Sequence, residues 1–414
     1  MSWALPARAW ATAAIALLFL ASGSRARAAT EEFSTFDVEA QEEDDESLLD
    51  HVLLRPPATW RDEWERAPQA IRTSQGCLTS GRWFIDTDLK LRSPLGTHAR
   101  MGLDVRQSES DVASYEYFDF SFKFPIAIGT PGAMFRPLFD KSRQDFALTW
   151  DAGTDSSRTQ GQLVFTFEDM FNNLWSWRQT SVGGVGEPYS RHPYEPGFWV
   201  VHRGERVRLE LSGRYLTPSR KDIAALSGPR VATLWGTLGA AAIEARAFGL
   251  TWEARGSNQQ ASSTDQPADL SSGDGGNFRR RWIAETAVRG RPIPRLATEL
   301  RWIYEDRSQN YDPPIGPSTF GAIDRLLVLD GLYEVRPTLA ARFGLMHDRI
   351  GVAQSGVHQA FTYGTRKESR AYIALIARFG RVSVQGIEGI ELDSEPYDVW
   401  FVHDKGFLHL QTTF

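Results

Sequence analysis

The chain has 414 residues, of which 42% are hydrophobic and 24% are charged, and its formal net charge is −6. Residues 31–50 contain ten acidic and no basic residues, so residues 51–414 are close to neutral. This balance excludes a strongly basic nucleic-acid-binding surface. The single cysteine, Cys77, excludes an intramolecular disulfide.

Residues 1–28 have the features of a secretory signal peptide. Arg8 precedes an apolar run over Ala9–Ala21, and Ala26-Arg27-Ala28 matches a cleavage site of small residues. The run is too short to span a bilayer as a helix, and no later stretch is long and apolar enough. We therefore predict that the chain is exported and that the mature protein has no transmembrane helix.

Residues 29–80 are predicted to precede the folded domain, as an acidic disordered arm followed by a short helical periplasmic segment. The arm contains five consecutive acids from Glu42 to Glu46. The stretch Thr59–Arg72 is compatible with a short helix that Thr59 caps and Pro68 interrupts. Two interpretations stay open: a spacer against the periplasmic rim of the next domain, or a plug or docking segment, with residues 31–72 meeting a periplasmic partner.

From Gly81 to Phe414 the hydrophobic pattern has a period of two. In residues 117–124, for example, every second residue from Phe118 to Phe124 is phenylalanine and the intervening residues are mostly polar. The same alternation occurs in 82–92, 206–215 and 295–305. Successive side chains of a strand face opposite sides, so each segment has one apolar and one ionic face.

The connections between these segments alternate between short and long. Together they predict about 18 strands, with 14 or 16 as alternatives, and a short turn separates the expected strands 230–239 and 242–255. This rhythm is typical of outer-membrane barrels, which have short periplasmic turns and longer external loops. The other short turns are expected near 170–173, 203–205, 290–294, 336–338 and 380, and the long loops at 182–196, 218–229, 256–277, 306–322 and 350–366.

The predicted fold class is therefore all-β, an antiparallel transmembrane β-barrel over residues 81–414. A soluble sandwich has the same period, but it would need more strands that are apolar on both faces. Aromatic residues of the apolar face also gather beside the expected external loops, as in an interfacial aromatic girdle. These residues are Tyr215, Trp252, Trp282, Trp302, Tyr304 and Trp400.

The last segment ends in an aromatic residue on the predicted lipid-facing row. Leu408, Leu410, Thr412 and Phe414 share one parity. A terminal strand that ends in an aromatic resembles the signal by which the barrel insertion machinery recognises its substrates, so Phe414 is the candidate assembly signal.

The whole of Gly81–Phe414 resembles the Gram-negative outer-membrane β-barrel superclass. About 18 strands with an arginine-rich lumen are similar in outline to the alginate-export family and to specific porins. The resemblance implies a location in the outer membrane, with outer-membrane lipids and the insertion machinery as partners. The eight histidines are scattered without metal-ligand spacing, so nothing in the sequence requires a cofactor or metal.

Charged residues of the inward parity are the candidate site. A hydrated pore lined by them would pass small hydrophilic solutes, anionic or saccharide, whereas neighbouring Arg–carboxylate pairs would merely neutralise one another and stiffen the wall. The lumen and selectivity candidates are Arg206, Arg208, Arg214, Arg281, Arg289, Arg295, Arg301, Glu210, Glu285 and Glu299.

Two other functions are open alternatives to a channel. One is a lipid-modifying enzyme on the barrel's outer rim, for which His347, next to Asp348, is the first candidate base. No nucleophile-elbow, zinc-protease or P-loop motif is present. The other is a plugged structural or docking barrel that acts through its acidic arm.

Overall fold

The structure is a computed structural model of the whole chain. It describes residues 60, 63–64, 67–77, 83–96, 98–110, 114–135, 144–153, 157–168, 189–191, 194–225, 228–267, 276–311, 318–356, 359–392 and 403–414. In these ranges, no helix has the length and apolar character needed to cross a membrane. The predicted signal peptide and acidic arm lie outside the described residues.

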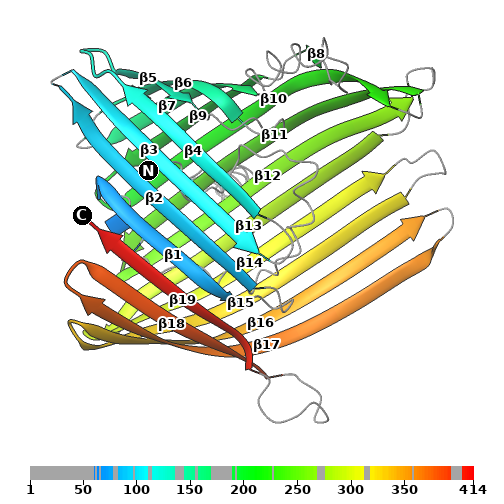
Figure 1. Cartoon of the computed structure of the whole chain (residues 1–414). Coiled ribbons are helices and arrows are strands. Elements are labelled where there is room, and N and C mark those ends of the chain that lie inside the picture. Colours follow the sequence, from blue (N-terminus) through cyan, green and yellow to red (C-terminus); the bar gives the residue numbers. More distant parts are fainter. Residues whose placement is uncertain are drawn as a thin grey trace, which may run out of the picture.

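The described residues form one antiparallel sheet that closes into a barrel (Figure 1). Strands pair with their neighbours in sequence, and the first strand closes the barrel by pairing with the last. Two consecutive strands, β8 and β9, pair with β10 one after the other, so the barrel has 18 strands around its circumference. The strands are β1 (Gln69–Cys77), β2 (Trp83–Leu95), β3 (Ala99–Ser110), β4 (Ser114–Lys123), β5 (Thr130–Phe135), β6 (Gln144–Ala152), β7 (Thr159–Glu168), β8 (Tyr189–Arg191), β9 (Tyr194–Arg203), β10 (Val207–Ala225), β11 (Gly228–Ala247), β12 (Leu250–Pro267), β13 (Gly276–Ile293), β14 (Leu296–Tyr311), β15 (Ser318–Arg336), β16 (Leu339–Gly356), β17 (Gln359–Phe379), β18 (Val382–Glu391) and β19 (His403–Thr413).

The barrel begins at Gln69 and not at the predicted Gly81. β1 pairs with β2 and β19, and Ala70 is fully buried between them. The prediction was wrong here because β1 is short and mostly polar, so its outward row has too few apolar residues to reveal the period of two. The additional strand expected at 173–181 lies outside the described residues.

Within the ranges given above, helical backbone occurs just before β1. Trp60, Glu63 and Trp64 are helical, and the N–H of Ala67 donates to the carbonyl of Glu63 at 2.9 Å. The helix predicted over Thr59–Arg72 therefore ends before Gln69, because β1 begins at that residue.

Several expected long loops are instead continuations of strands. β10 to β17 have 16 to 21 residues each, whereas a tilted strand crosses a bilayer in about 9–11. The loop predicted at 256–277 is reduced to 268–275, and only two residues, 226–227, separate β10 from β11. These loop predictions were wrong because a strand that extends beyond the bilayer has water on both faces and therefore needs no apolar row.

The short connections gather at one rim, together with the C-terminus (Figure 1). The N–H of Phe414 donates to the carbonyl of Gln69 at 2.9 Å, so the end of β19 and the start of β1 meet there. Short turns mark the periplasmic side of such barrels, so the long hairpins of β10 to β17 extend on the external side. One periplasmic turn, Phe248-Gly249, has positive φ at both residues (54° and 74°), as a two-residue hairpin turn requires.

The turn at Phe248-Gly249 replaces the one expected between residues 239 and 242. Because β11 is longer than predicted, Trp252 lies at the periplasmic rim and not beside an external loop. The prediction that Trp252 belongs to the external girdle was wrong, because the sequence gave no sign of the turn just before it. Phenylalanine rarely adopts a positive φ, so Phe248 does not indicate a turn.

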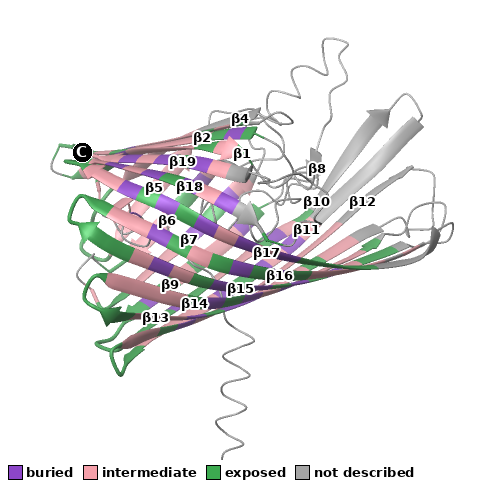
Figure 2. Ribbon diagram, turned by 90° about the horizontal axis from the view of Figure 1, so that it is seen from below, coloured by how far each residue is buried: buried purple, intermediate pink, exposed green. Residues whose placement is uncertain are grey.

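The two faces of the wall alternate as the period of two predicts, and Figure 2 shows buried and exposed positions alternating along β15 to β17. Large apolar side chains such as Leu300, Leu327 and Leu375 face outward, and about half of each is exposed. A water-soluble protein would bury such a continuous apolar belt, whereas lipid covers it in a membrane barrel. The chain is therefore a transmembrane β-barrel.

Candidate functional site in the barrel lumen

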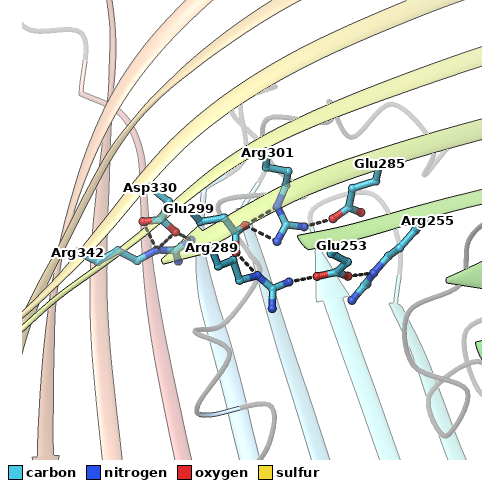
Figure 3. Close-up of polar contacts among 8 residues, drawn as sticks. All are labelled: Glu253, Arg255, Glu285, Arg289, Glu299, Arg301, Asp330 and Arg342. Atoms are coloured by element: carbon cyan, nitrogen blue, oxygen red, sulfur yellow. Dashed lines mark hydrogen bonds and ion pairs between the residues drawn. The ribbon is translucent and has the colours of Figure 1, made fainter. Parts of the chain in front are cut away.

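The inward face of β12 to β16 carries a connected set of charged side chains, which we call the arginine ladder (Figure 3). Alternation along each strand points its members inward, and the antiparallel register places them side by side, as in the pairs Arg255↔Glu285, Arg289↔Glu299 and Glu299↔Asp330. The ladder consists of Glu253, Arg255, Glu285, Arg289, Glu299, Arg301, Asp330 and Arg342.

Each central guanidinium of the ladder is shared between two carboxylates. Arg289 Nε lies 2.6 Å from Glu299 Oε2, and the same guanidinium also contacts Glu253. Arg301 Nε donates to Glu299 Oε1 at 2.6 Å and its guanidinium also contacts Glu285. The charges therefore balance within the ladder, and charge-assisted hydrogen bonds of this kind hold the side chains in a fixed geometry.

The ladder extends toward the next strands through a bidentate pair. Arg342 Nη2 lies 2.8 Å from Asp330 Oδ2, and Arg342 Nε donates to Asp330 Oδ1 at 3.1 Å. The Arg342 guanidinium also lies 5.4 Å from the centroid of the Tyr372 ring. A planar guanidinium can make the bidentate contact with Asp330 and also stack on the ring, whereas a lysine ammonium cannot make the bidentate contact.

Other predicted lumen arginines also lie beside carboxylates. Arg214 Nη1 donates to Glu195 Oε1 at 2.8 Å, and Arg281 Nε donates to Glu305 Oε1 at 2.6 Å. Arg208 Nη2 donates to Glu210 Oε2 at 3.1 Å. The structure thus brings the predicted inward cations and acids together as pairs, which is the self-neutralising arrangement that the sequence left open.

Two predicted lumen residues do not line the barrel wall. Arg206 and Arg295 are exposed and lie in the short turns that precede β10 and β14. Their carbonyls accept hydrogen bonds from the N–H groups of Arg246 and Glu334 at 2.8 Å. These two assignments were wrong because an alternating pattern cannot tell the last inward residue of a strand from the first residue of a turn.

Sequence reasoning missed an apolar area on the inward face, which we call the apolar lumen patch. Its members alternate along their strands with outward residues such as Leu327 and Ile373, so they face the lumen, and all are buried. A run apolar at every position, such as Tyr372–Ala377, was the available signal. The patch consists of Phe84, Ile303, Leu326, Val328, Met346, Tyr372, Ala374, Ile387 and Phe407.

A glycine of β1 permits the two aromatic rings of the patch to meet. Gly76 pairs with Phe84 on one side and Phe407 on the other, and the ring centroids are 5.7 Å apart. A Cβ at Gly76 would lie 2.8 Å from a ring carbon of Phe407. The closing strand is thus adapted to an apolar lumen at this point.

The residues before β1 contact inward-facing side chains near the periplasmic mouth. Trp60 is buried, and its carbonyl accepts a hydrogen bond from Gln411 Nε2 at 2.9 Å. Arg378 Nη2 donates to Glu63 Oε1 at 2.8 Å. The Arg72 guanidinium lies 4.7 Å from the centroid of the Trp64 ring. This segment therefore docks inside the mouth and spans at least β17, β19 and β1.

The predicted girdle residues that the structure describes, Trp252 apart, lie on the outward face toward the external side. Tyr215 and Trp302 are exposed, and the Tyr304 ring contacts both Trp302 and Trp282, at centroid distances of 6.1 and 5.6 Å. Trp400 lies outside the described residues. The candidate base His347 is also outward-facing, and its Nδ1 lies 2.9 Å from Ser369 Oγ.

Comparison with known proteins finds no matching family model and no matching curated protein. Among solved structures, CdiB from Acinetobacter baumannii is 8% identical with a TM-score of 0.43; the match covers 84% of this chain and 60% of CdiB. A bacterial polysaccharide outer membrane secretin is 11% identical with a TM-score of 0.37, and OccK2 (OpdF) from Pseudomonas aeruginosa is 9% identical with a TM-score of 0.40. Each of these two matches covers 84% of this chain and 97% of the other protein.

The barrel geometry itself identifies the class of this protein. A closed sheet with an even number of strands, short turns at one rim and an outward apolar belt is the architecture of Gram-negative outer-membrane proteins. The chain is an outer-membrane β-barrel, and the predicted fold class and location are confirmed.

Proposed function

We propose that this protein is an outer-membrane channel for small hydrophilic solutes, with the arginine ladder as its selectivity element. The observation that supports this function is the continuous row of paired charges on the inward face of five neighbouring strands. Barrels of about 16–18 strands are too wide for side chains to fill and leave an aqueous passage. Charged rings in such a passage set its selectivity.

The pairing within the ladder favours polyhydroxylated or weakly anionic solutes over strongly charged ones. Because each guanidinium already contacts a carboxylate, the ladder has little net charge to attract a free anion. It still presents many donors and acceptors at fixed positions, since a guanidinium has five N–H groups and a carboxylate about four lone pairs. Saccharide hydroxyl groups, which both donate and accept, match this surface.

The apolar lumen patch and the docked segment before β1 both narrow the passage. Leu326, Met346 and Trp60 are all buried, so part of the inward face near them offers no polar group to a passing solute. We therefore expect a channel of low conductance and not a wide general pore.

Planar-bilayer recording and liposome swelling test this proposal. The purified barrel is expected to give small discrete conductance steps in KCl and to admit small saccharides into liposomes. Absence of conductance at every salt concentration, together with absence of swelling, would contradict the channel function and favour the plugged docking barrel.

A lipid hydrolase at the outer face is a second candidate, which the hydrogen bond between His347 and Ser369 favours. The pair lies on the lipid-facing side, where a hydroxyl nucleophile with an adjacent base would meet lipid esters. One observation argues against a hydrolase. The residue of β15 that pairs with His347 is Leu327, so this position of β15 provides no carboxylate or amide to orient the imidazole. Turnover of a labelled lipid by the wild type that is lost in both His347→Ala and Ser369→Ala would establish this activity.

The assembly role of Phe414 and the periplasmic partner of residues 31–72 belong to the same proposal. The outward position of Phe414 beside Gln69, at the periplasmic rim, suits recognition by the insertion machinery. Trp60 and Glu63 contact the inside of the periplasmic mouth through one hydrogen bond each, which would allow a periplasmic partner to displace this segment.

A further inference from the structure

Three basic residues form a line across the outward face of the barrel, which we call the cation row. Arg325 of β15 pairs in register with Arg349 of β16, and Arg349 pairs with Lys367 of β17. All three side chains are exposed. Neighbouring strands are about 4.8 Å apart, so the three cations start from adjacent positions on one face.

The cation row lies near the external edge of the apolar belt, since the next row toward the exterior is Ile323, Gly351 and Thr365, with one large apolar side chain. The next outward row toward the periplasm is Leu327, His347 and Ser369, and the row after that includes Leu329 and Leu345, each about half exposed. Lipid acyl chains cover this belt, so the cation row is at the level of the headgroups of the external leaflet.

Aromatic residues of the girdle support this level. Tyr304 pairs in register with Arg325, and the Arg325 guanidinium lies 5.9 Å from the centroid of the Tyr304 ring. Tyrosine and tryptophan settle at the boundary between acyl chains and water. The aromatic cluster of Trp302, Tyr304 and Trp282 therefore fixes the same boundary from the adjacent strands.

The electrostatics of the row differ from those of the lumen. The arginines of the ladder share carboxylates, whereas within the described part of the chain no ion pair joins Arg325, Arg349 or Lys367 to an acid. Like charges directly opposite one another across strands repel, which destabilises the sheet unless an anion lies between them. Guanidinium groups bind phosphate oxygens in a bidentate manner, and an ammonium adds a point charge.

We propose that the cation row binds the phosphate groups of a lipid in the external leaflet, with the acyl chains of that lipid lying against Leu327, Leu345 and Ile373. Charge complementarity selects a phosphorylated headgroup, and the adjacent apolar belt selects a lipid over a soluble phosphate. This site is on the opposite face of the wall from the lumen and does not depend on the channel function.

Native mass spectrometry of the full-length barrel in detergent tests this site, with diphosphorylated lipid A as the probe. The triple variant R325Q/R349Q/K367Q is expected to bind lipid A at least about ten-fold more weakly than the wild type. The matched control is R206Q/R295Q/R336Q, which removes three exposed cations at the periplasmic rim and is expected to bind like the wild type. Equal binding by the row variant, or an equal loss in the control, would overturn the proposal.

Two further measurements separate lipid from free phosphate and binding from misfolding. Inorganic pyrophosphate at the same concentration is expected not to displace lipid A, and full displacement would overturn the assignment to a lipid. The charge-conserving variant R325K/R349K is expected to recover part of the affinity. The heat-modifiable mobility of each variant on gels shows whether its barrel is folded, and a folded row variant with unchanged binding contradicts the site.

Discussion

Arg301 is the residue on which the arginine ladder most depends, because it is buried and contacts two carboxylates. About 4% of Arg301 and 7% of Glu285 is exposed. The guanidinium compensates both Glu285 and Glu299. A buried charge that loses its partner destabilises a fold far more than a surface charge does.

We predict that Arg301→Leu lowers the free energy of unfolding by about 3 kcal/mol, since it removes a buried cation that two carboxylates share. Urea unfolding of the barrel in lipid vesicles, followed by tryptophan fluorescence, measures this change. Arg206→Leu, in an exposed turn, is the control and is expected to change stability by less than about 0.5 kcal/mol. Equal effects of the two substitutions would contradict the structural role of the ladder.

The Glu299 carboxylate forms ion pairs with both Arg289 and Arg301 and so offsets part of their positive charge. Glu299→Gln removes a negative charge and leaves the side-chain volume nearly unchanged, so the lumen gains net positive charge. We predict that the chloride-to-potassium permeability ratio rises by about two-fold or more, measured from the reversal potential in a KCl gradient. Glu334→Gln, at the exposed end of β15, is the matched control, and a similar shift there would exclude a specific effect of the ladder.

At the scale of elements, the segment before β1 is the one whose contacts suggest that it can be released. It is held by a few polar and cation–π contacts to several strands: Gln411 contacts Trp60, Arg378 contacts Glu63, and both Arg72 and Lys90 contact Trp64. Exposed pairs such as Arg378–Glu63 contribute at most about 1 kcal/mol each. The segment is therefore held weakly compared with the strands of the wall.

We predict that the double variant W60A/E63A increases single-channel conductance, on the order of two-fold, because it loosens the segment that narrows the periplasmic mouth. Planar-bilayer recording measures the step size. Deletion of residues 31–50, which leaves Trp60 in place, is the control and is expected to keep the wild-type conductance. A higher conductance after this deletion alone would mean that the acidic arm, and not Trp60 and Glu63, restricts the passage.

The elements also show which sequence patterns were reliable. The membrane-spanning parts of β14 and β16 were predictable, since lipid on one face and water on the other impose the alternation. The external parts of β12 and β13 and the polar β1 were not, because a strand with water on both faces or with a polar outward row carries no apolar period. The pairing of Arg289 and Arg301 with acids was predictable only as a class, since alternation gives the face of a side chain but not its partner.

At the scale of the whole molecule, closure between β1 and β19 removes the sheet edge that a membrane cannot tolerate. Seven residues of each strand pair in register from Ala70 to Gly76. Without β1, β2 and β19 would both expose unpaired backbone groups to lipid.

We predict that deletion of residues 60–77 prevents formation of the folded, heat-modifiable barrel in detergent or vesicles, because the edges of β2 and β19 cannot meet. Gel mobility without boiling measures the folded fraction. Deletion of residues 31–58, which keeps β1, is expected to leave folding intact. A folded barrel without β1 would mean that the remaining strands close by themselves.

The amino-acid sequence by itself determined that this protein is a membrane barrel, because every bilayer-spanning strand must present an apolar face and no strand edge can stay open. It also determined that the inward face is ionic, since the charged residues occupy one parity. Only the tertiary structure decided that the lumen arginines share carboxylates, that the inward face carries an apolar patch with Trp60 docked in the periplasmic mouth, and that Arg325, Arg349 and Lys367 lie in a line. The physical reason is that these contacts depend on the register between strands, which brings together residues that the local pattern of any one strand cannot relate.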